Sequence, residues 1–419
     1  MRRTIQRVLF ACSFETLLLA PAGAGEANYQ PYIVGERAPG MGGAVCATAE
    51  GMDAAFYNPA GLGWVRRDSI SVNGTFYGLQ HYKTDDTLFP GEALGVDSFI
   101  TIPAGISGVN RLGANAVGAF SVFVPSQSSA KEIRAFAERQ HFYNSSYDEQ
   151  TLWIGPSLGY AVNDRLTLGA SVFVVYQNVT QFNNLYWGDY SYAYAVNYDY
   201  LSWGLMAAIG AQYRLAEHWH VGLTVMSPSL ALYGSGRWQE HGLLSDGQAH
   251  NADYVFLEDL DAVNGLPTQL KLGLAWQVPK KVTLGLDVTH HFARSYDVLS
   301  NDKDALPRHR QAVTDVQAGG EYYIGGRYPI RAGAFTSFSA APDVDPLDNY
   351  AMPHVDLYGL TASVGLEREH LVVSVGLNYI FGSGEALGRT FAGDKSLQGA
   401  VTHTDERALY FFLTTAYLF

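Results

Sequence analysis

The chain has little charge and no long hydrophobic run. Charged residues make up 16% of its 419 residues, below the roughly 25% of an ordinary soluble protein, although 47% of the residues are hydrophobic. No segment beyond residue 24 reaches the ~18 consecutive apolar residues that a membrane-crossing helix needs. The composition therefore excludes a helical membrane protein and argues against ordinary soluble domains. The 44 glycines and 27 tyrosines favour a β-rich protein at a membrane interface.

Cysteine and positive charge are also scarce. Cys46 is the one cysteine after the predicted leader, so it has no partner for an internal disulfide. It lies among small residues, and we predict a packed, inert thiol. The formal net charge of −13 argues against nucleic acid as a partner.

Motifs for catalysis and metal binding are missing. The sequence contains no H-E-x-x-H, G-x-S-x-G, P-loop or G-x-G-x-x-G motif. The histidine pairs His218/His220 and His290/His291 have no carboxylate or cysteine at ligand spacing to complete a zinc site. We therefore predict neither an enzyme nor a bound metal or cofactor.

Residues 1–24 have the pattern of a secretory signal peptide. Arg2, Arg3 and Arg7 form a basic start, an apolar segment follows from Val8 to Ala20, and the next small residues offer a cleavage site. A secreted chain without membrane helices is either soluble or a β-barrel.

Beyond residue 68 the sequence alternates with a period of two. Between residues 281 and 292, Val282, Leu284, Leu286 and Val288 alternate with Thr283, Gly285, Asp287 and Thr289. This alternation is the signal of a β-strand. Small and polar residues on the second face indicate a wet interior, as in an outer-membrane barrel.

We predict an all-β fold, a 14-stranded antiparallel transmembrane β-barrel over residues 68–419 with a hatch formed by residues 25–67 inside its lumen. The predicted strands are 68–80, 97–106, 114–124, 148–162, 165–180, 198–214, 218–238, 266–278, 281–292, 312–324, 328–339, 355–368, 370–380 and 405–419. Short connections alternate with long ones, and this segregation is typical of bacterial outer-membrane barrels.

The predicted hatch is crowded with glycine and alanine. From Gly35 to Leu62 it has few side chains with which to build a core, and Asn58-Pro59 and Ala60-Gly61 are turn-forming pairs. Such a segment needs a wall formed by other residues, and the barrel supplies one. The residues that we assign to the hatch and its gating are Gly42, Gly43, Asp53, Asn58, Pro59, Ala60 and Gly61.

The same stretch resembles a known family. Gly35, Arg37, the cluster from Gly40 to Ala44, Asp53 and the run N-P-A-G-L from Asn58 to Leu62 are similar to the N-terminal signature of the FadL family of outer-membrane channels. The resemblance implies a plugged 14-stranded barrel that transports long-chain fatty acids or aromatic hydrocarbons. The terminal strand, which ends at Phe419, resembles the segment by which outer-membrane assembly machinery recognises its substrates. We therefore expect this machinery, outer-membrane lipid and lipopolysaccharide as partners.

The resemblance also implies a lateral opening of the barrel wall beside the hatch. Proline removes a ladder hydrogen bond, so within a closed barrel it marks a local defect. The candidates are Pro103 and Gly155-Pro156, and we prefer Pro103 because Gly105 follows it.

A fatty-acid carboxylate needs a cation in an otherwise apolar pocket. Arg37 in the hatch and the inward-facing Lys271 and Arg331 are the candidates. The alternative is that they form salt bridges in the lumen with Asp287, Asp315 or Glu321, since barrel interiors are polar in any case.

Two predicted loops stand out. Residues 129–142 have helical spacing, which fits either a short amphipathic helix over the barrel mouth or a solvated loop. Residues 186–200 hold six tyrosines and a tryptophan, which fits either a loading surface for an apolar ligand or an extended strand with interfacial aromatics.

We predict a channel for passive, hatch-gated uptake of hydrophobic small molecules across the bacterial outer membrane. The alternative is a barrel that binds or shuttles secreted proteins. A lipid hydrolase is a third hypothesis, against which the absent nucleophile motif argues.

Overall fold

The computed structural model describes residues 27–136, 141–187, 192–245, 250–301, 305–348, 351–391 and 397–419. The predicted signal peptide lies outside these residues. The helices are η1 (Ala38–Met41), α1 (Gly51–Tyr57) and η2 (Pro59–Trp64). The strands are β1 (Ser69–Thr84), β2 (Leu94–Arg111), β3 (Ala116–Phe136), β4 (His141–Ala161), β5 (Leu166–Trp187), β6 (Tyr192–Arg214), β7 (Trp219–Met226), β8 (Leu230–Ser245), β9 (His250–Ala262), β10 (Gln269–Val278), β11 (Val282–His291), β12 (Arg294–Ser300), β13 (Ala305–Arg310), β14 (Val313–Ile324), β15 (Tyr328–Ser337), β16 (His354–Glu367), β17 (Leu371–Phe391) and β18 (Leu397–Leu418).

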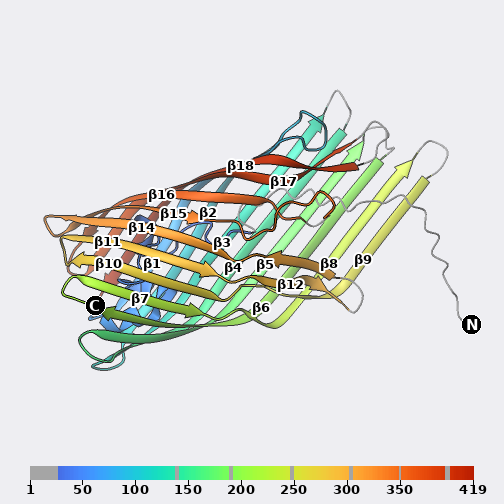
Figure 1. Ribbon diagram of the computed structural model, residues 1–419. Coiled ribbons are helices and arrows are strands. Elements are labelled where there is room, and N and C mark those ends of the chain that lie inside the picture. The colour runs from blue at the N-terminus through green and yellow to red at the C-terminus, as the bar shows by residue number, and fades with distance from the viewer. Residues whose placement is uncertain are drawn as a thin grey trace, which may run out of the picture.

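The strands form a closed antiparallel barrel with a short irregular segment inside it (Figure 1). Pairing of β1 with β18 closes the wall, from Ser69 opposite Leu418 to Thr84 opposite Thr404. Closure leaves no long free edge, which is what a sheet in lipid requires. No described helix is both long and apolar enough to cross a membrane.

Side chains alternate across the wall as the sequence pattern predicted. In β11, Leu284 and Leu286 are exposed on the outside, whereas Thr283 and Asp287 are buried inside. The same division of apolar outside and polar inside recurs in the last strand, where Phe411 is exposed and Thr414 is buried. An apolar exterior is the face that a barrel presents to lipid.

The predicted number of fourteen strands is wrong. The described residues form eighteen strands joined in one hydrogen-bonded sheet, and the closed barrel counts sixteen. Part of the difference arises where predicted loops are strands: residues 239–265 contain β9, and residues 293–311 contain β12 and β13. These strands are rich in polar residues, so they lack the apolar face that signals a lipid-facing strand.

The rest of the difference comes from interruptions. The predicted strand 218–238 is divided into β7 and β8 at Pro228. Proline has no N–H for the ladder, so the pairing stops beside it and the chain resumes as a new strand.

Of residues 129–142, residues 137–140 lie outside the described residues, and for the others the predicted alternatives, a helix or a solvated loop, are also wrong. Residues 129–136 belong to β3 and pair with β4 as far as Phe136 opposite His141. Ladder hydrogen bonds to a neighbouring strand outweigh the weak helical spacing of an isolated segment. In the aromatic stretch 186–200, the described residues 186–187 and 192–200 belong to β5 and β6, and Tyr194, Tyr198 and Tyr200 in β6 are buried.

Residues 27–67 lie inside the barrel, in the half of the barrel at whose end the C-terminus lies (Figure 1, blue). Most of them are buried, and Met41, Cys46, Met52 and Leu62 are buried completely. We call residues 27–67 the hatch.

Candidate functional site

The Asp53 carboxylate organises the first half of the hatch. Its two oxygens accept hydrogen bonds from the backbone N–H groups of Glu36 (2.6 Å), Arg37 (2.9 Å) and Ala38 (3.0 Å). Asp53 lies in the first turn of α1, so it fastens the segment before η1 to this helix. Burial raises the pKa of Asp53, and the three donated hydrogen bonds oppose that shift.

The glycine pair at Gly42 and Gly43 makes the tight bend that follows η1. Their φ angles are +63° and +81°, a region that side chains other than glycine rarely adopt. At Gly42 an added Cβ would also lie 2.8 Å from the backbone nitrogen of Ala334 in β15. The bend therefore needs glycine for its conformation and for its contact with the wall.

The N-P-A-G run forms the second turn of the hatch. The Asn58 side chain accepts from the N–H of Ala60 (3.2 Å) and donates to the carbonyl oxygens of Cys46 (2.9 Å) and Ala211 in β6 (3.1 Å). Pro59 begins η2, where its fixed φ favours the helical turn. At Gly61 an added Cβ would lie 1.9 Å from the carbonyl oxygen of Ala49, so this turn has no room for a side chain.

Two of the three predicted ligand-binding cations are paired with one carboxylate. Arg37 Nε lies 3.1 Å from one oxygen of Glu321, and Arg331 Nε lies 2.6 Å from the other. All three side chains are largely buried. The geometry of these two arginines is that of the alternative prediction, a salt bridge across the lumen.

Lys271 has a different environment. In the described part of the chain it forms no salt bridge, and its ammonium nitrogen lies 4.8 Å from the centre of the Tyr57 ring. The nearby Asp287 instead accepts hydrogen bonds from the hatch N–H groups of Val45 (3.0 Å) and Cys46 (2.8 Å). The ammonium group therefore lies over an aromatic face, an arrangement that favours a cation.

Lys271 lines a pocket between the hatch and the wall. The space measures about 820 Å³, including its open side, and its lining is mainly apolar and aromatic. The lining residues from the hatch are Tyr29, Gln30, Tyr32, Phe56 and Tyr57, and those from the wall include Trp153, Met206, Met226, Leu266 and Lys271. We call this space the hatch pocket. Mostly apolar walls with a few polar groups are typical of sites for small hydrophobic ligands.

Two further donors in the hatch pocket have no partner among the described residues. They are the indole nitrogen of Trp153 and the amide nitrogen of Gln30, and both atoms are buried. Phe56 stacks on the Trp153 ring with 5.2 Å between the centroids. The pocket therefore offers hydrogen-bond donors and a cation beside flat aromatic surfaces.

A second, more polar space adjoins the hatch pocket and shares Tyr29, Pro125 and Trp153 with it. Its lining includes Tyr147 and Tyr200. Both tyrosines belong to an aromatic cluster that includes Tyr143, Tyr147, Tyr194, Tyr198, Tyr200 and Trp238. The cluster, the polar space and the hatch pocket are thus adjacent inside the barrel.

The wall is irregular beside the hatch pocket. The β2–β3 ladder joins Gly105–Arg111 to Val117–Phe123, and in the described chain no β2 residue before Gly105 pairs with β3. The β1–β2 register also shifts twice between Asn73 and Gly78, opposite Pro103. Of the predicted lateral-opening residues, Pro103 lies in this break and Gly105 is the paired residue at its edge. The β4–β5 ladder, in contrast, resumes after Gly155-Pro156.

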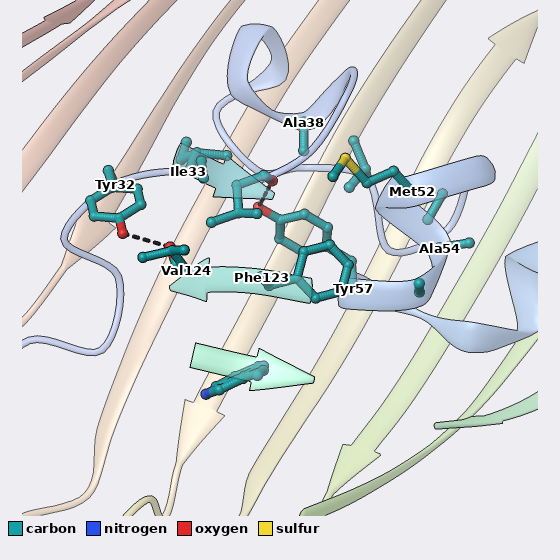
Figure 2. Close-up of a cluster of buried hydrophobic side chains, with 14 of the residues drawn as sticks. Tyr32, Ile33, Ala38, Met52, Ala54, Tyr57, Phe123 and Val124 are labelled. Atoms are coloured by element: carbon teal, nitrogen blue, oxygen red, sulfur yellow. Dashed lines mark hydrogen bonds between the residues drawn. The ribbon is translucent and has the colours of Figure 1, made fainter. Parts of the chain in front are cut away.

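A hatch side chain reaches the end of this interrupted ladder. The Tyr32 hydroxyl donates a hydrogen bond to the carbonyl oxygen of Val124, the residue after the last paired position of β3 (Figure 2). Tyr57, Phe123 and Met52 lie in the same buried cluster. Tyr32 thus connects the hatch to the wall at the point where β2 and β3 separate.

The sequence did not single out Tyr32, Phe56 or Trp153 as site residues. Whether these side chains meet depends on which strands become neighbours in the barrel. A single aromatic residue in an alternating pattern does not indicate which strand will lie next to its own. The four histidines of the predicted pairs belong to no cluster of three metal-binding side chains among the described residues. Burial raises the pKa of the Cys46 thiol to about 12, which opposes formation of the reactive thiolate.

No protein-family model and no curated protein sequence matches the chain. Solved structures do match it. A FadL homologue from Pseudomonas aeruginosa is 14% identical with a TM-score of 0.68, and the match covers 93% of this chain and 99% of that chain. The toluene transporter TodX of Pseudomonas putida is 14% identical with a TM-score of 0.69 and the same coverage.

The toluene transporter TbuX of Ralstonia pickettii is 15% identical with a TM-score of 0.63, and the match covers 92% of this chain and 98% of that chain. Identities this low are evidence about the fold, and the match extends over the hatch as well as the wall because nearly the whole chain is covered. The chain therefore has the fold of the FadL family of outer-membrane channels, and the resemblance predicted from its N-terminal motif is confirmed at that level.

Proposed function

We propose that the protein is a passive, hatch-gated channel of the bacterial outer membrane for hydrophobic molecules that carry an acidic group, long-chain fatty acids above all. The observation that carries this proposal is the Lys271 ammonium group, which lies in the hatch pocket without a carboxylate partner among the described residues. The unpartnered donors of Trp153 and Gln30 beside it suit the oxygens of a carboxylate.

The aromatic cluster around Tyr198 and Trp238 is the proposed loading surface. These two rings stack in parallel with 5.4 Å between their centroids. From there a ligand passes through the polar space into the hatch pocket, where its apolar part contacts Phe56 and Trp153 and its carboxylate meets Lys271.

The proposed exit is the break in the wall above Gly105. Pro125 of β3 lines the hatch pocket, and it lies just beyond Phe123, the last β3 residue that pairs with β2. A molecule that leaves here enters the membrane sideways, which suits an apolar solute that gains free energy when it leaves water. The known transport of toluene by similar barrels is consistent with a lumen for hydrophobic solutes.

The test measures the uptake of oleate and of toluene by a strain from which the protein has been deleted. The strain is then supplied with the wild-type protein, Lys271→Met or Lys271→Arg. Removal of the buried cation is expected to weaken oleate uptake about tenfold or more, while Lys271→Arg retains most of it. Toluene uptake, which needs no cation, is the matched control and stays unchanged. Equal oleate uptake by wild type and Lys271→Met, with folded barrels in the membrane, contradicts the proposal.

A further inference from the structure

The short turns at one end of the barrel each carry, or directly follow, an arginine or a lysine. Six of these cations are exposed and form no ion pair among the described residues. They are Arg66 before β1, Arg111 at the end of β2, Arg165 before β5, Lys281 before β11, Arg327 before β15 and Arg368 before β17. We call these six residues the basic rim.

Backbone hydrogen bonds between neighbouring turns and strand ends place the basic rim on one circle around the barrel. The N–H groups and the carbonyl oxygens that they contact, at 2.8–2.9 Å, are Arg214 to Arg165, Tyr323 to Lys281, Glu367 to Arg327, and Phe419 to Asp68. Since Phe419 is the last residue, the rim lies at the end of the barrel where the C-terminus lies (Figure 1). In an outer-membrane barrel the short turns face the periplasm.

The charge of this end is opposite in sign to that of the whole chain. Nine arginines and lysines stand against five acidic residues in the ranges 65–68, 111–116, 162–165, 214–218, 279–281, 325–328 and 367–370. Towards the other end, residues 81–97 hold one lysine and four acidic residues, and residues 250–261 hold four acidic residues without a lysine or arginine. Positive charge is therefore concentrated at the periplasmic end of a chain whose formal net charge is −13.

The basic rim borders the surface that faces lipid. Tyr160, Tyr322 and Tyr328 are exposed at the strand ends next to Arg165 and Arg327. Aromatic side chains in such positions mark the level of the lipid headgroups. Arginine and lysine at this level place their aliphatic stems against apolar surface and their charge among the headgroups. The rim cations thus lie at the level of the phosphates of the periplasmic leaflet.

We propose that the basic rim binds the phosphate groups of anionic phospholipids, such as phosphatidylglycerol and cardiolipin, and retains a shell of these lipids around the periplasmic end of the barrel. The cations are distributed around the circumference, so each one meets lipid, whereas docking of an acidic protein needs cations gathered in one patch. A cation without a carboxylate partner has its full charge for the attraction to an anionic leaflet. This inference does not depend on which molecule the hatch pocket binds.

The experiment reconstitutes the folded barrel in phosphatidylcholine vesicles that contain a trace of spin-labelled phosphatidylglycerol or spin-labelled phosphatidylcholine. Electron paramagnetic resonance measures the fraction of each probe that the protein immobilises. The wild type is expected to prefer phosphatidylglycerol about fivefold. The preference is expected to disappear in about 1 M sodium chloride, where charges are screened within about 3 Å.

The test variant combines Arg111→Gln, Arg165→Gln and Arg327→Gln, and is expected to lower the preference about threefold. The corresponding Arg→Lys substitutions keep the charges and retain the preference. The matched control removes three cations towards the other end of the barrel, with Lys83→Gln, Lys131→Gln and Arg407→Gln, and retains it as well. The change in electrophoretic mobility on heating verifies that each barrel is folded.

Three outcomes overturn the inference: equal immobilisation of both probes by the wild type, an unchanged preference in the test variant, or an equal loss in the matched control. Should the test variant not fold, the wild type decides, because a preference that persists in about 1 M sodium chloride is not electrostatic and also overturns the inference. No arm of the experiment measures uptake, so its result is separate from that of the oleate test.

Discussion

Single charged residues in the hatch and on the wall around it have different electrostatic roles although they share one confined space. Asp53 is a structural acceptor with three backbone donors, and Arg37 and Arg331 share the Glu321 carboxylate. Lys271 is the exception, because it has no ion pair in the described chain. In a buried ion pair the two charges neutralise each other. The cation without such a partner is therefore the one that we propose binds an anionic ligand.

Glu36 provides a prediction about pH. Burial and the nearby Asp53 raise the pKa of Glu36 from about 4.5 to about 7, while the Ser71 hydroxyl donates to it at 3.0 Å. The docked hatch therefore favours the protonated form. Its docking is most stable below the pKa of the free side chain and weakens as the pH rises through about 7.

We expect docking of the hatch to lose about 2 kcal/mol between about pH 5 and about pH 8, and Glu36→Gln to remove most of this loss. The measurement is the urea concentration at which the near-ultraviolet circular dichroism of the buried tyrosines disappears. A pH dependence that is the same in the wild type and in Glu36→Gln would assign it to other groups.

At the scale of secondary-structure elements, β2 and β3 differ from the other strand pairs. Their ladder ends at Gly105 opposite Phe123, although both strands continue well beyond these residues. Above the break the two strands are held by side-chain contacts such as the Gln127 amide to the Thr101 carbonyl oxygen (3.3 Å). Side-chain contacts separate more easily than a continuous ladder.

A covalent link across this break is expected to reduce oleate uptake several-fold, because the ligand then has no lateral exit. The variant carries Thr101→Cys and Gln127→Cys, joined by a short thiol crosslinker. The matched control joins Tyr358→Cys to Phe381→Cys, which are partners in the intact β16–β17 ladder. Undiminished uptake after complete crosslinking of β2 to β3 would rule out this exit.

At the scale of the whole molecule, wall and hatch depend on each other. The hatch has few large side chains and obtains its burial from the barrel, while the barrel interior is filled by the hatch in the half towards the C-terminus (Figure 1). Asn58 joins the two parts because its one amide group donates both to the hatch and to β6.

Deletion of residues 58–62 is therefore expected to raise the permeability of the outer membrane to small hydrophilic solutes several-fold, without preventing the barrel from closing. The measurement is the rate at which cells take up a small hydrophilic antibiotic. Vancomycin, which is too large for the lumen, controls for general damage to the membrane. Unchanged permeability would contradict the role of the hatch as a plug.

The sequence by itself determined the local features of this protein. Alternation along β11 predicted which side chains face lipid, because side-chain direction in a strand has a period of two. The pairs Asn58-Pro59 and Ala60-Gly61 predicted a turn of the hatch, because the fixed φ of proline and the freedom of glycine are local properties. These features need only residues that are neighbours in the chain.

Only the tertiary structure decided the number of strands, the environments of the cations and which glycines of the wall contact the hatch. Lys271 and Arg331 look alike in the sequence, and what separates them is whether Glu321 lies within reach. Gly319 and Gly320 are adjacent, yet only Gly319 faces the hatch backbone at Met41. These distinctions depend on register between segments that are distant in the chain, and a local pattern carries no information about such register.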